Sequence, residues 1–177
     1  MIIMGVALLI WAPKTLSRRL RSKEERVKQK GVVALSGILF VASFILAGLD
    51  FRFGWSSLPH WVVWTSSIVF LLSYGMYAEV MRENEWLSRS IEVMEGQKVV
   101  STGLYGIVRH PMYTATILMF LAMPLVMGSW WAFFVMVPYV IAIVTRIKDE
   151  ETLLTKELEG YLEYKEKVRW KLIPYIW

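Results

Sequence analysis

The sequence predicts an all-α protein, a polytopic integral membrane helical bundle with about five transmembrane helices. A C-terminal helical hairpin and a cytosolic C-terminal segment are expected to complete it. Of the 177 residues, 56% are hydrophobic, whereas soluble domains average about 45–50%. Three long stretches also contain no Asp, Glu, Lys or Arg, which is the pattern that a bilayer core requires. These stretches are Gly31–Leu49, Phe53–Ala78 and His110–Thr145.

Helix geometry sets the number of crossings. A helix rises about 1.5 Å per residue and the hydrocarbon core is roughly 30 Å thick, so about 20 apolar residues make one span. Gly31–Leu49 and Leu58–Tyr77 each predict one span. His110–Thr145 is too long for one span but sufficient for two short ones. Within it, Met127-Gly128-Ser129 predicts the turn of a tight hairpin, and Trp130-Trp131 predicts an aromatic anchor at the interface.

The amino-terminal segment and the basic residues decide the expected orientation. Met1–Ala12 is apolar but too short to cross alone, so we expect a thinned or extended first span, or a partly inserted anchor. A cleaved signal peptide is disfavoured because no positive region precedes the apolar run. With five crossings, all of the 20 Lys and Arg residues except Arg52 fall on one side. Positive charge marks the cytoplasmic side, so we expect the carboxyl terminus there.

Two charged segments flank these spans. In Lys14–Lys30, the spacing of apolar residues is compatible with a helix lying on anionic lipid, although a solvated topology determinant is the preferred interpretation. Further along, Glu79 with Arg82, and Glu85 with Arg89, stand at helical neighbour spacing. This spacing predicts that the helix of Leu58–Tyr77 continues out of the membrane as a charged stub.

The composition excludes several functional classes. The chain contains no cysteine, which excludes disulfides, thiolate metal sites and cysteine nucleophiles. With only two histidines, no metal site is expected. The basic residues flank membrane segments and do not form a soluble basic module, so no nucleic-acid partner is expected. His60, near the external end of a span, is expected to be an interfacial or packing residue.

Two polar clusters stand at the ends of the predicted hairpin. Arg109–Tyr113 opens it and Arg146–Glu151 follows its last apolar residue. Because a tight hairpin places its ends side by side, the two clusters are expected to meet at the cytosolic boundary. Ionisable groups packed on membrane helices indicate a functional site. A purely structural alternative remains, with Pro111 as a first-turn proline, Tyr113 as an interfacial aromatic and Glu150 at a solvated helix end.

The order and spacing of these residues resemble a known group of enzymes. The motifs are Gly103-x-Tyr105, Arg109-His110-Pro111-x-Tyr113, Arg146-x-x-x-Glu150-Glu151-x-x-Leu154 and Tyr161-x-x-Tyr164. Together, over Gln97–Pro174, they resemble the isoprenylcysteine carboxyl methyltransferase family and its relatives, the phospholipid methyltransferases. These families are multi-span membrane enzymes that use S-adenosylmethionine without a Rossmann fold, and no Gly-x-Gly-x-x-Gly occurs here. The run Leu158-Glu159-Gly160-Tyr161 departs from the family pattern by about one residue.

The resemblance implies a division of the chain and a set of site residues. The single expected membrane domain, 1–177, divides into N-terminal spans in 1–96 and a cofactor-binding and catalytic half in 97–177. Arg146 and Glu150 are the implied catalytic residues; Arg146 handles the substrate head group and Glu150 binds cofactor. Their spacing places both on one helix face. The implied cofactor contacts are Gln97, Lys98, Val99, Val100, Tyr105, His110, Pro111, Met112, Tyr113 and Glu150.

The expected function is methyl transfer from S-adenosylmethionine to a lipophilic acceptor. The carboxylate of an isoprenylcysteine-like substrate is the leading candidate, and Arg146 is suited to bind it through two parallel hydrogen bonds. Phospholipid N-methylation, an NADPH-dependent reductase of the sterol type and a non-catalytic membrane scaffold remain alternatives. The expected partners are a lipophilic or prenylated substrate and membrane lipid, whereas the sequence leaves the oligomeric state open.

Overall fold

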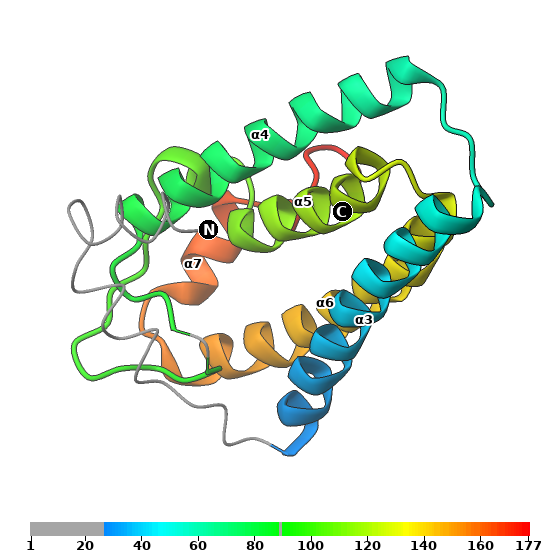
Figure 1. Cartoon of the computed structure of the whole chain (residues 1–177). Helices are drawn as coiled ribbons and strands as arrows, with labels where there is room; N and C mark the ends of the chain where they lie inside the picture. The colour runs from blue at the N-terminus through cyan, green and yellow to red at the C-terminus, as the bar shows by residue number, and fades with distance from the viewer. Residues whose placement is uncertain (1–26, 89) are drawn as a thin grey trace. The chain divides into compact units, whose positions relative to one another are not determined.

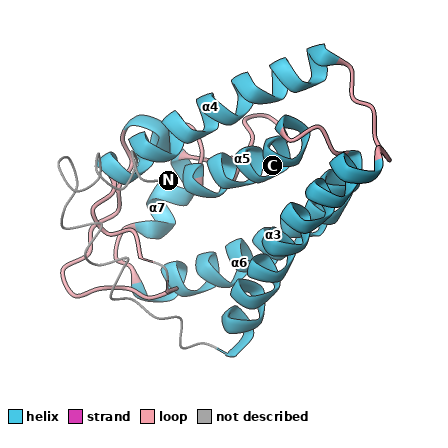
Figure 2. Cartoon of the chain, viewed as in Figure 1, coloured by secondary structure: helices cyan, strands magenta, loops and turns pink. Residues whose placement is uncertain are grey.

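The computed structural model describes residues 27–88 and 90–177, so the expected first span Met1–Ala12 lies outside it, as does most of Lys14–Lys30. The described part is all-α (Figure 2), with helices joined by loops and turns and with no strand. Figure 1 labels its α-helices. They are α3 (Val27–Phe53), α4 (His60–Glu83), α5 (Pro111–Val126), α6 (Trp130–Glu157) and α7 (Tyr161–Lys167), with a short 3-10 helix, η1, at Gly103–Gly106.

Three of these helices are long and apolar enough to cross a membrane. The candidate spans are Gln29–Phe53, His60–Glu83 and Trp130–Glu157, and α5 is a shorter apolar helix. The chain is therefore a helical membrane protein, as the composition predicts. The total of five crossings and the sidedness stay predictions, because the first expected span lies outside the described residues.

The predicted break of the hairpin is confirmed. Helix α5 ends at Val126 and α6 begins at Trp130, so the apolar stretch forms two helices. Between them Gly128 has a φ of 78°, a left-handed conformation that glycine adopts without steric cost. The backbone N–H of Ser129 donates to the Pro124 carbonyl at 3.0 Å, which closes the turn.

The predicted extension of the second described span is only partly right. Helix α4 continues past Tyr77, and Arg82 Nε donates to Glu79 Oε2 at 2.9 Å. The helix ends at Glu83, however, so the prediction of a stub reaching Glu85–Arg89 is wrong. The cause is Asn84, whose side-chain oxygen accepts a hydrogen bond from the Trp86 N–H at 2.9 Å. Such a local side-chain bond gives the backbone an alternative to the helix.

The chain forms two compact units, each described by itself. In the described part, the polar unit comprises Met76–Thr114 and Ile147–Trp177, and the apolar unit comprises Val27–Gly75 and Ala115–Arg146. Each unit is therefore assembled from segments that are distant in the sequence. The expected clusters at the hairpin ends fall mainly in the polar unit.

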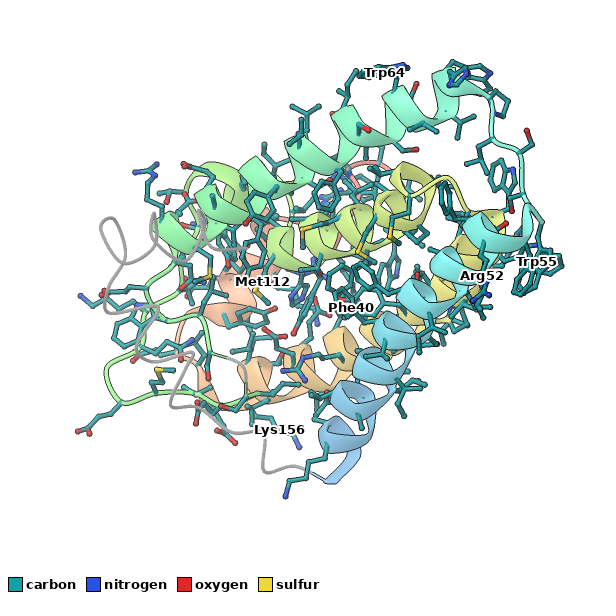
Figure 3. The ribbon with its side chains drawn as sticks, in the orientation of Figure 1. Phe40, Arg52, Trp55, Trp64, Met112 and Lys156 are labelled. Atoms are coloured by element: carbon teal, nitrogen blue, oxygen red, sulfur yellow. The ribbon has the colours of Figure 1, made fainter. Side chains whose placement is uncertain are left out.

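In the apolar unit, α3 and the first part of α6 lie side by side (Figure 1). The Ser43 hydroxyl donates to the Ala132 carbonyl at 3.3 Å, which shows how closely the two backbones approach. The Phe120 ring bridges Phe40 and Tyr139, with centroid distances of 5.6 and 4.9 Å. Large side chains such as Trp64, which is 71% exposed, point outward (Figure 3). An apolar exterior of this kind suits a lipid environment.

The apolar unit also contains a buried carboxylate near the end of α3. Asp50 accepts hydrogen bonds from the Ser56 N–H and hydroxyl, each at 2.6 Å, and from the Ser129 hydroxyl. Ser129 Oγ in turn accepts from the Ala132 N–H at 3.1 Å, as an N-cap of α6. This cluster joins the loop after α3 to the hairpin turn.

Candidate functional site

The polar unit is built around the carboxylate of Glu151 on α6. Arg109 Nε donates to Glu151 Oε1 at 2.7 Å, and the two side chains are only 4% and 7% exposed. Lys171 Nζ lies 3.0 Å from Glu151 Oε2, and His110 Nε2 lies 3.4 Å from Oε1. The structure thus brings the polar clusters at the two hairpin ends together. A buried charge needs such partners, because burial removes its hydration.

Arg109 also holds the C-terminal segment. Its Nη1 donates to the carbonyls of Val168 and Arg169 at 2.7 and 2.8 Å. The backbone N–H groups of Arg109 and His110 donate to the carbonyls of Trp170 and Lys171, each at 2.9 Å. One buried guanidinium therefore fixes α6, the start of α5 and the chain after α7.

Glu150 differs sharply from its neighbour Glu151. Tyr113 Oη donates to Glu150 Oε2 at 2.6 Å, and the side chain of Glu150 is half-buried. Within the described residues, Glu150 forms no ion pair. Its hydrogen-bond donor is the neutral hydroxyl of Tyr113. In the part of the chain that the structure describes, no basic side chain therefore pairs with the negative charge of Glu150. A carboxylate in this state suits a cationic ligand.

The predicted residue Tyr105 lies in η1 and is anchored from two sides. Asn84 Nδ2, directly after α4, donates to Tyr105 Oη at 2.9 Å. Tyr164 Oη, on α7, donates to the Tyr105 carbonyl at 2.8 Å. Tyr105 is therefore held by the segment after α4 and by α7, the orange helix in Figure 1.

The glycine of the Gly-x-Tyr motif is required by its surroundings. Gly103 has a φ of 47°, and a Cβ atom there would lie 2.2 Å from Glu83 Oε1. Glu83 accepts hydrogen bonds from the Thr102 hydroxyl at 2.8 Å and from the Leu104 N–H at 3.2 Å. Any side chain at Gly103 would displace this carboxylate, and η1 would lose its attachment to the end of α4.

Three buried tyrosines of the polar unit remain protonated near neutral pH. Burial raises the pKa of Tyr105, Tyr161 and Tyr164 above the ordinary value near 10. For Tyr161, the negative charges of Glu151 and Glu150 raise the pKa further. These hydroxyls are therefore hydrogen-bonding groups and not bases.

The other predicted cofactor contacts occupy varied environments in the polar unit. Val99 packs against the core formed by Leu158, Tyr161, Tyr164 and Val168. Lys98 is exposed, whereas Gln97 Oε1 accepts from the Met94 N–H at 2.9 Å. Met112 lies in the first turn of α5 (Figure 3). Their roles as cofactor contacts stay predictions.

Pro111 is the first residue of α5 and is almost fully buried. Its missing N–H costs nothing there, because the first helical turn has no internal partner for it. Next to it His110 is buried as well, with its ring centroid 5.8 Å from that of Tyr113. This segment is therefore rigidly packed where the two polar clusters meet.

Arg146 lies one turn before Glu150 on α6. Its side chain is buried in the apolar unit, where Nη1 donates to Gln29 Oε1 at 3.1 Å. Gln29, at the beginning of α3, is only 1% exposed. Nothing in the sequence pattern singles out Gln29, because it is one amide in a basic run. The predicted substrate-binding role of Arg146 stays a prediction.

Sequence reasoning also missed Glu83, Asn84 and Lys171. Glu83 and Asn84 stand where a span ends, and that position was the available signal for them. No signal in the sequence distinguished Lys171, since it resembles the other lysines of the C-terminal segment. All three act through contacts between segments that are distant in the chain.

Comparison with known proteins matches residues 61–159 to the phospholipid methyltransferase family. A Delta(14)-sterol reductase of Methylotuvimicrobium alcaliphilum is 30% identical over 93 residues, which is 51% of this chain and 22% of that protein. The Delta(14)-sterol reductase TM7SF2 of Mus musculus is 29% identical over 91 residues, 50% of this chain and 22% of that protein. The similarity thus spans less than a quarter of the length of these curated relatives.

Proposed function

The chain belongs to the phospholipid methyltransferase family, and on this premise we propose that it transfers a methyl group from S-adenosylmethionine to a lipophilic acceptor. The three apolar helices suit an enzyme that takes its acceptor from the bilayer. A water-borne donor and a membrane-dissolved acceptor have to meet at the boundary between lipid and water. The polar unit, at the ends of the hairpin helices, has the charged groups that such a boundary site requires.

The observation that carries this proposal is the contrast between Glu150 and Glu151. Two cations and an imidazole surround Glu151, so both of its carboxylate oxygens already have partners within the fold. Glu150 accepts a hydrogen bond from Tyr113 and forms no ion pair with any residue that the structure describes. S-adenosylmethionine carries a sulfonium and an ammonium group, and Glu150 fits either one. Glu150 is therefore the proposed anchor of the methyl donor.

The donor supplies a methyl group on a positively charged sulfur, so that transfer is a displacement in line with the carbon–sulfur bond. The protein's tasks are to align the acceptor and to exclude water. Alignment alone contributes roughly 7–11 kcal/mol in favourable systems. Tyr113 restricts the carboxylate of Glu150 to one orientation, and Arg109 fixes the segments around it. Such rigidity keeps a bound ligand in its reactive geometry.

The remaining predicted contacts belong to the same unit. We propose that η1 and the segment before it cover the donor, because Tyr105 is held at its hydroxyl and its carbonyl. His110 and Tyr113 line the adjacent start of α5. The proposed donor-contacting residues besides Glu150 are Gln97, Lys98, Val99, Val100, Tyr105, His110, Pro111, Met112 and Tyr113.

Arg146 is the proposed acceptor-binding residue. A buried guanidinium suits an anionic head group, because its planar donors match two oxygen atoms. The carboxylate of an isoprenylcysteine-like substrate fits this chemistry, and methylation then yields an ester. A phospholipid amine is the alternative acceptor, and its phosphate is the group that Arg146 would hold.

Calorimetry with S-adenosylhomocysteine tests the donor site. The full chain in detergent is expected to bind it, and Glu150→Gln to bind it at least about tenfold more weakly, since a charge-assisted contact is worth about 1.5–3 kcal/mol. Glu159→Gln is the matched control, because that carboxylate is exposed after the end of α6. The proposal is wrong if the wild-type protein, shown to be folded, releases no heat with either form of the donor.

Radiolabelled methyl transfer identifies the acceptor. We expect label from S-adenosylmethionine on a farnesylcysteine analogue as a base-labile ester, and Arg146→Ala to abolish this transfer while donor binding is retained. Base-stable label on phosphatidylethanolamine would instead identify an N-methyltransferase. Equal loss of donor binding and transfer in Arg146→Ala would contradict the assigned role of Arg146.

The absence of cysteine provides a direct test of the proposed sidedness. A single cysteine that replaces Lys156, near the end of α6, or Trp55, after the end of α3, would be exposed. With the carboxyl terminus in the cytosol, we expect an impermeant maleimide to label Trp55→Cys in intact cells, and Lys156→Cys only after lysis. Labelling of Lys156→Cys in intact cells would contradict the proposed orientation.

A membrane reductase is the second candidate, because both curated relatives are named Delta(14)-sterol reductases. The negative charge of Glu150, which forms no ion pair within the described residues, disfavours it, since NADPH is strongly anionic. Thermal stabilisation by NADPH alone would select this function. A non-catalytic scaffold would bind neither ligand, and Arg146→Ala would then change nothing except stability.

A further inference from the structure

The hydroxyl of Tyr161 has no hydrogen-bond partner in the part of the chain that the structure describes. Tyr161 is only 3% exposed, so its hydroxyl is removed from bulk water. The three other buried tyrosines of the described polar unit differ, because Tyr105 Oη bonds to Asn84, Tyr113 Oη to Glu150 and Tyr164 Oη to the Tyr105 carbonyl. Tyr161 thus differs from these tyrosines, whose hydroxyls form hydrogen bonds.

Local geometry fixes this side chain firmly. Gly160, with a φ of 79°, turns the chain after α6, and Tyr161 begins α7. The ring packs in a core with Leu158, Tyr164 and Val168, and its centroid lies 5.8 Å from that of Tyr164. Since the ring is held by this packing, the hydroxyl has little freedom to find another partner.

The surroundings of the hydroxyl are negatively charged. The charges of Glu151 and Glu150 both act on Tyr161 and raise its pKa beyond the effect of burial, while Arg109 opposes them. Glu151 is paired with Arg109, Lys171 and His110, whereas Tyr113 is the one partner of Glu150 among the described residues. Leu154, one helical turn after Glu150 on α6, packs against the core that contains Tyr161, so this core lies next to the segment that bears the proposed donor anchor.

A buried hydroxyl without a partner is unfavourable, and most buried polar groups in proteins are hydrogen-bonded. Phenylalanine would fill the same core without this disadvantage. The hydroxyl is therefore best explained by a partner that arrives with a ligand. An ammonium group is a suitable partner, because its three N–H donors can reach a phenol oxygen and a carboxylate together.

We infer that Tyr161 is a ligand-binding residue whose hydroxyl oxygen accepts a hydrogen bond from the ammonium group of S-adenosylmethionine, which Glu150 also binds. This inference rests on the proposed function and adds to it the part of the donor that the site recognises. No covalent step is involved, since Tyr161 contributes to binding only.

The test is a cycle in which the hydroxyl and the ammonium group are removed separately and together. The probes are S-adenosylhomocysteine and its analogue without the amino group, with affinities measured by calorimetry on the full chain in detergent. Tyr161→Phe is expected to bind S-adenosylhomocysteine about tenfold more weakly than the wild type does, which corresponds to about one hydrogen bond. With the deaminated analogue, the two proteins are expected to differ less than about twofold.

Thr155→Val is the matched control. Its hydroxyl is the other buried side-chain group of the described polar unit without a partner. Both substitutions remove such a hydroxyl, so both are expected to leave the ligand-free melting temperature unchanged or raised. Thr155→Val is expected to keep the wild-type affinity for S-adenosylhomocysteine, whereas Tyr161→Phe is not.

With the Tyr161→Phe variant, two results would overturn the inference: unchanged affinity for S-adenosylhomocysteine, or an equal loss with both ligands. The wild-type protein supplies a measurement that needs no variant, since it should bind S-adenosylhomocysteine more tightly than the deaminated analogue. Equal affinities there would also overturn it. Failure of the proposed function is distinct, because the wild-type protein would then bind neither ligand.

Discussion

Two buried carboxylates in different units are stabilised in opposite ways. In the polar unit, Glu151 is surrounded by Arg109, Lys171 and His110. In the apolar unit, Asp50 is bound by the Ser56 N–H and by the hydroxyls of Ser56 and Ser129. Basic side chains thus surround one carboxylate, whereas neutral donors alone bind the other in the described structure.

This difference predicts how much stability each region loses when one partner of its carboxylate is removed. Removing one neutral donor from Asp50 costs about one hydrogen bond, roughly 1 kcal/mol. Removing a cation from Glu151 leaves a buried charge without its closest partner, which is several times more costly. Arg109 and Lys171 both pair with Glu151, and neither forms an ion pair with the adjacent Glu150 in the described structure.

The largest expected effect is that of Arg109→Ala. This change leaves Glu151 without its 2.7 Å partner and two carbonyls without their donor. We expect a loss of about 3–5 kcal/mol in the free energy of unfolding. Denaturant unfolding in detergent measures it. Arg82→Ala, in an exposed pair with Glu79, is the control and should change stability little. Similar losses in both would remove the distinction between buried and exposed pairs.

Asp50→Ala should have a smaller effect of about 1–3 kcal/mol, because it leaves buried neutral donors unpaired and strands no charge. Ser129→Ala should cost less still, about 1 kcal/mol, since the Ser56 donors to Asp50 remain. Unfolding measured as for Arg109→Ala allows direct comparison. A loss for Asp50→Ala exceeding that of Arg109→Ala would reverse the ranking of the two regions.

A third carboxylate, Glu83, resembles Asp50 in having neutral partners, although it lies in the polar unit. Gly103→Ala should displace it and also strain the left-handed backbone, with a total cost of about 2 kcal/mol or more. Gly96→Ala isolates the backbone effect, because Gly96 has a φ of 72° and open space around it. Thermal unfolding of both variants measures the difference. Equal losses would show that the contact with Glu83 contributes nothing.

The smallest effect concerns pH. Burial raises the pKa of Tyr105, Tyr161 and Tyr164, so the folded protein keeps their protons more tightly than the unfolded chain does. Stability is therefore expected to be unaffected below the ordinary pKa near 10 and to fall as the pH rises above it. Tyrosinate absorbance and melting temperature between about pH 9 and 11 report this. Ionisation of all eight tyrosines at their ordinary pKa would contradict it.

Much of the fold was predictable because it depends on local patterns. The hairpin turn follows from a glycine between two apolar runs, and the start of α5 follows from Pro111. The end of α4 was not predictable from charge spacing, because Asn84 bonds both to the nearby Trp86 N–H and to the distant Tyr105 hydroxyl. The second of these contacts requires knowledge of the tertiary structure.

The candidate site shows the same division. The hairpin alone predicts that the two polar clusters meet. The hydrogen bonds of Tyr113 with Glu150 and of Arg109 with Glu151 confirm this prediction. The different partners of Glu150 and Glu151 could not be predicted from the sequence, because the two residues are identical in type and adjacent. Successive residues of a helix point about 100° apart, and their neighbours belong to other segments.

The sequence by itself determined that this is a helical membrane protein with a hairpin whose ends carry complementary polar groups. Apolar run length, glycine and charge are local properties, and they suffice for that. Tertiary structure alone decided, for the described residues, which carboxylate forms ion pairs, which accepts a hydrogen bond from a tyrosine, and which tyrosine hydroxyl has no partner. These properties depend on side chains from distant segments of the chain, such as Arg109 and Glu151, which are separated by 42 positions.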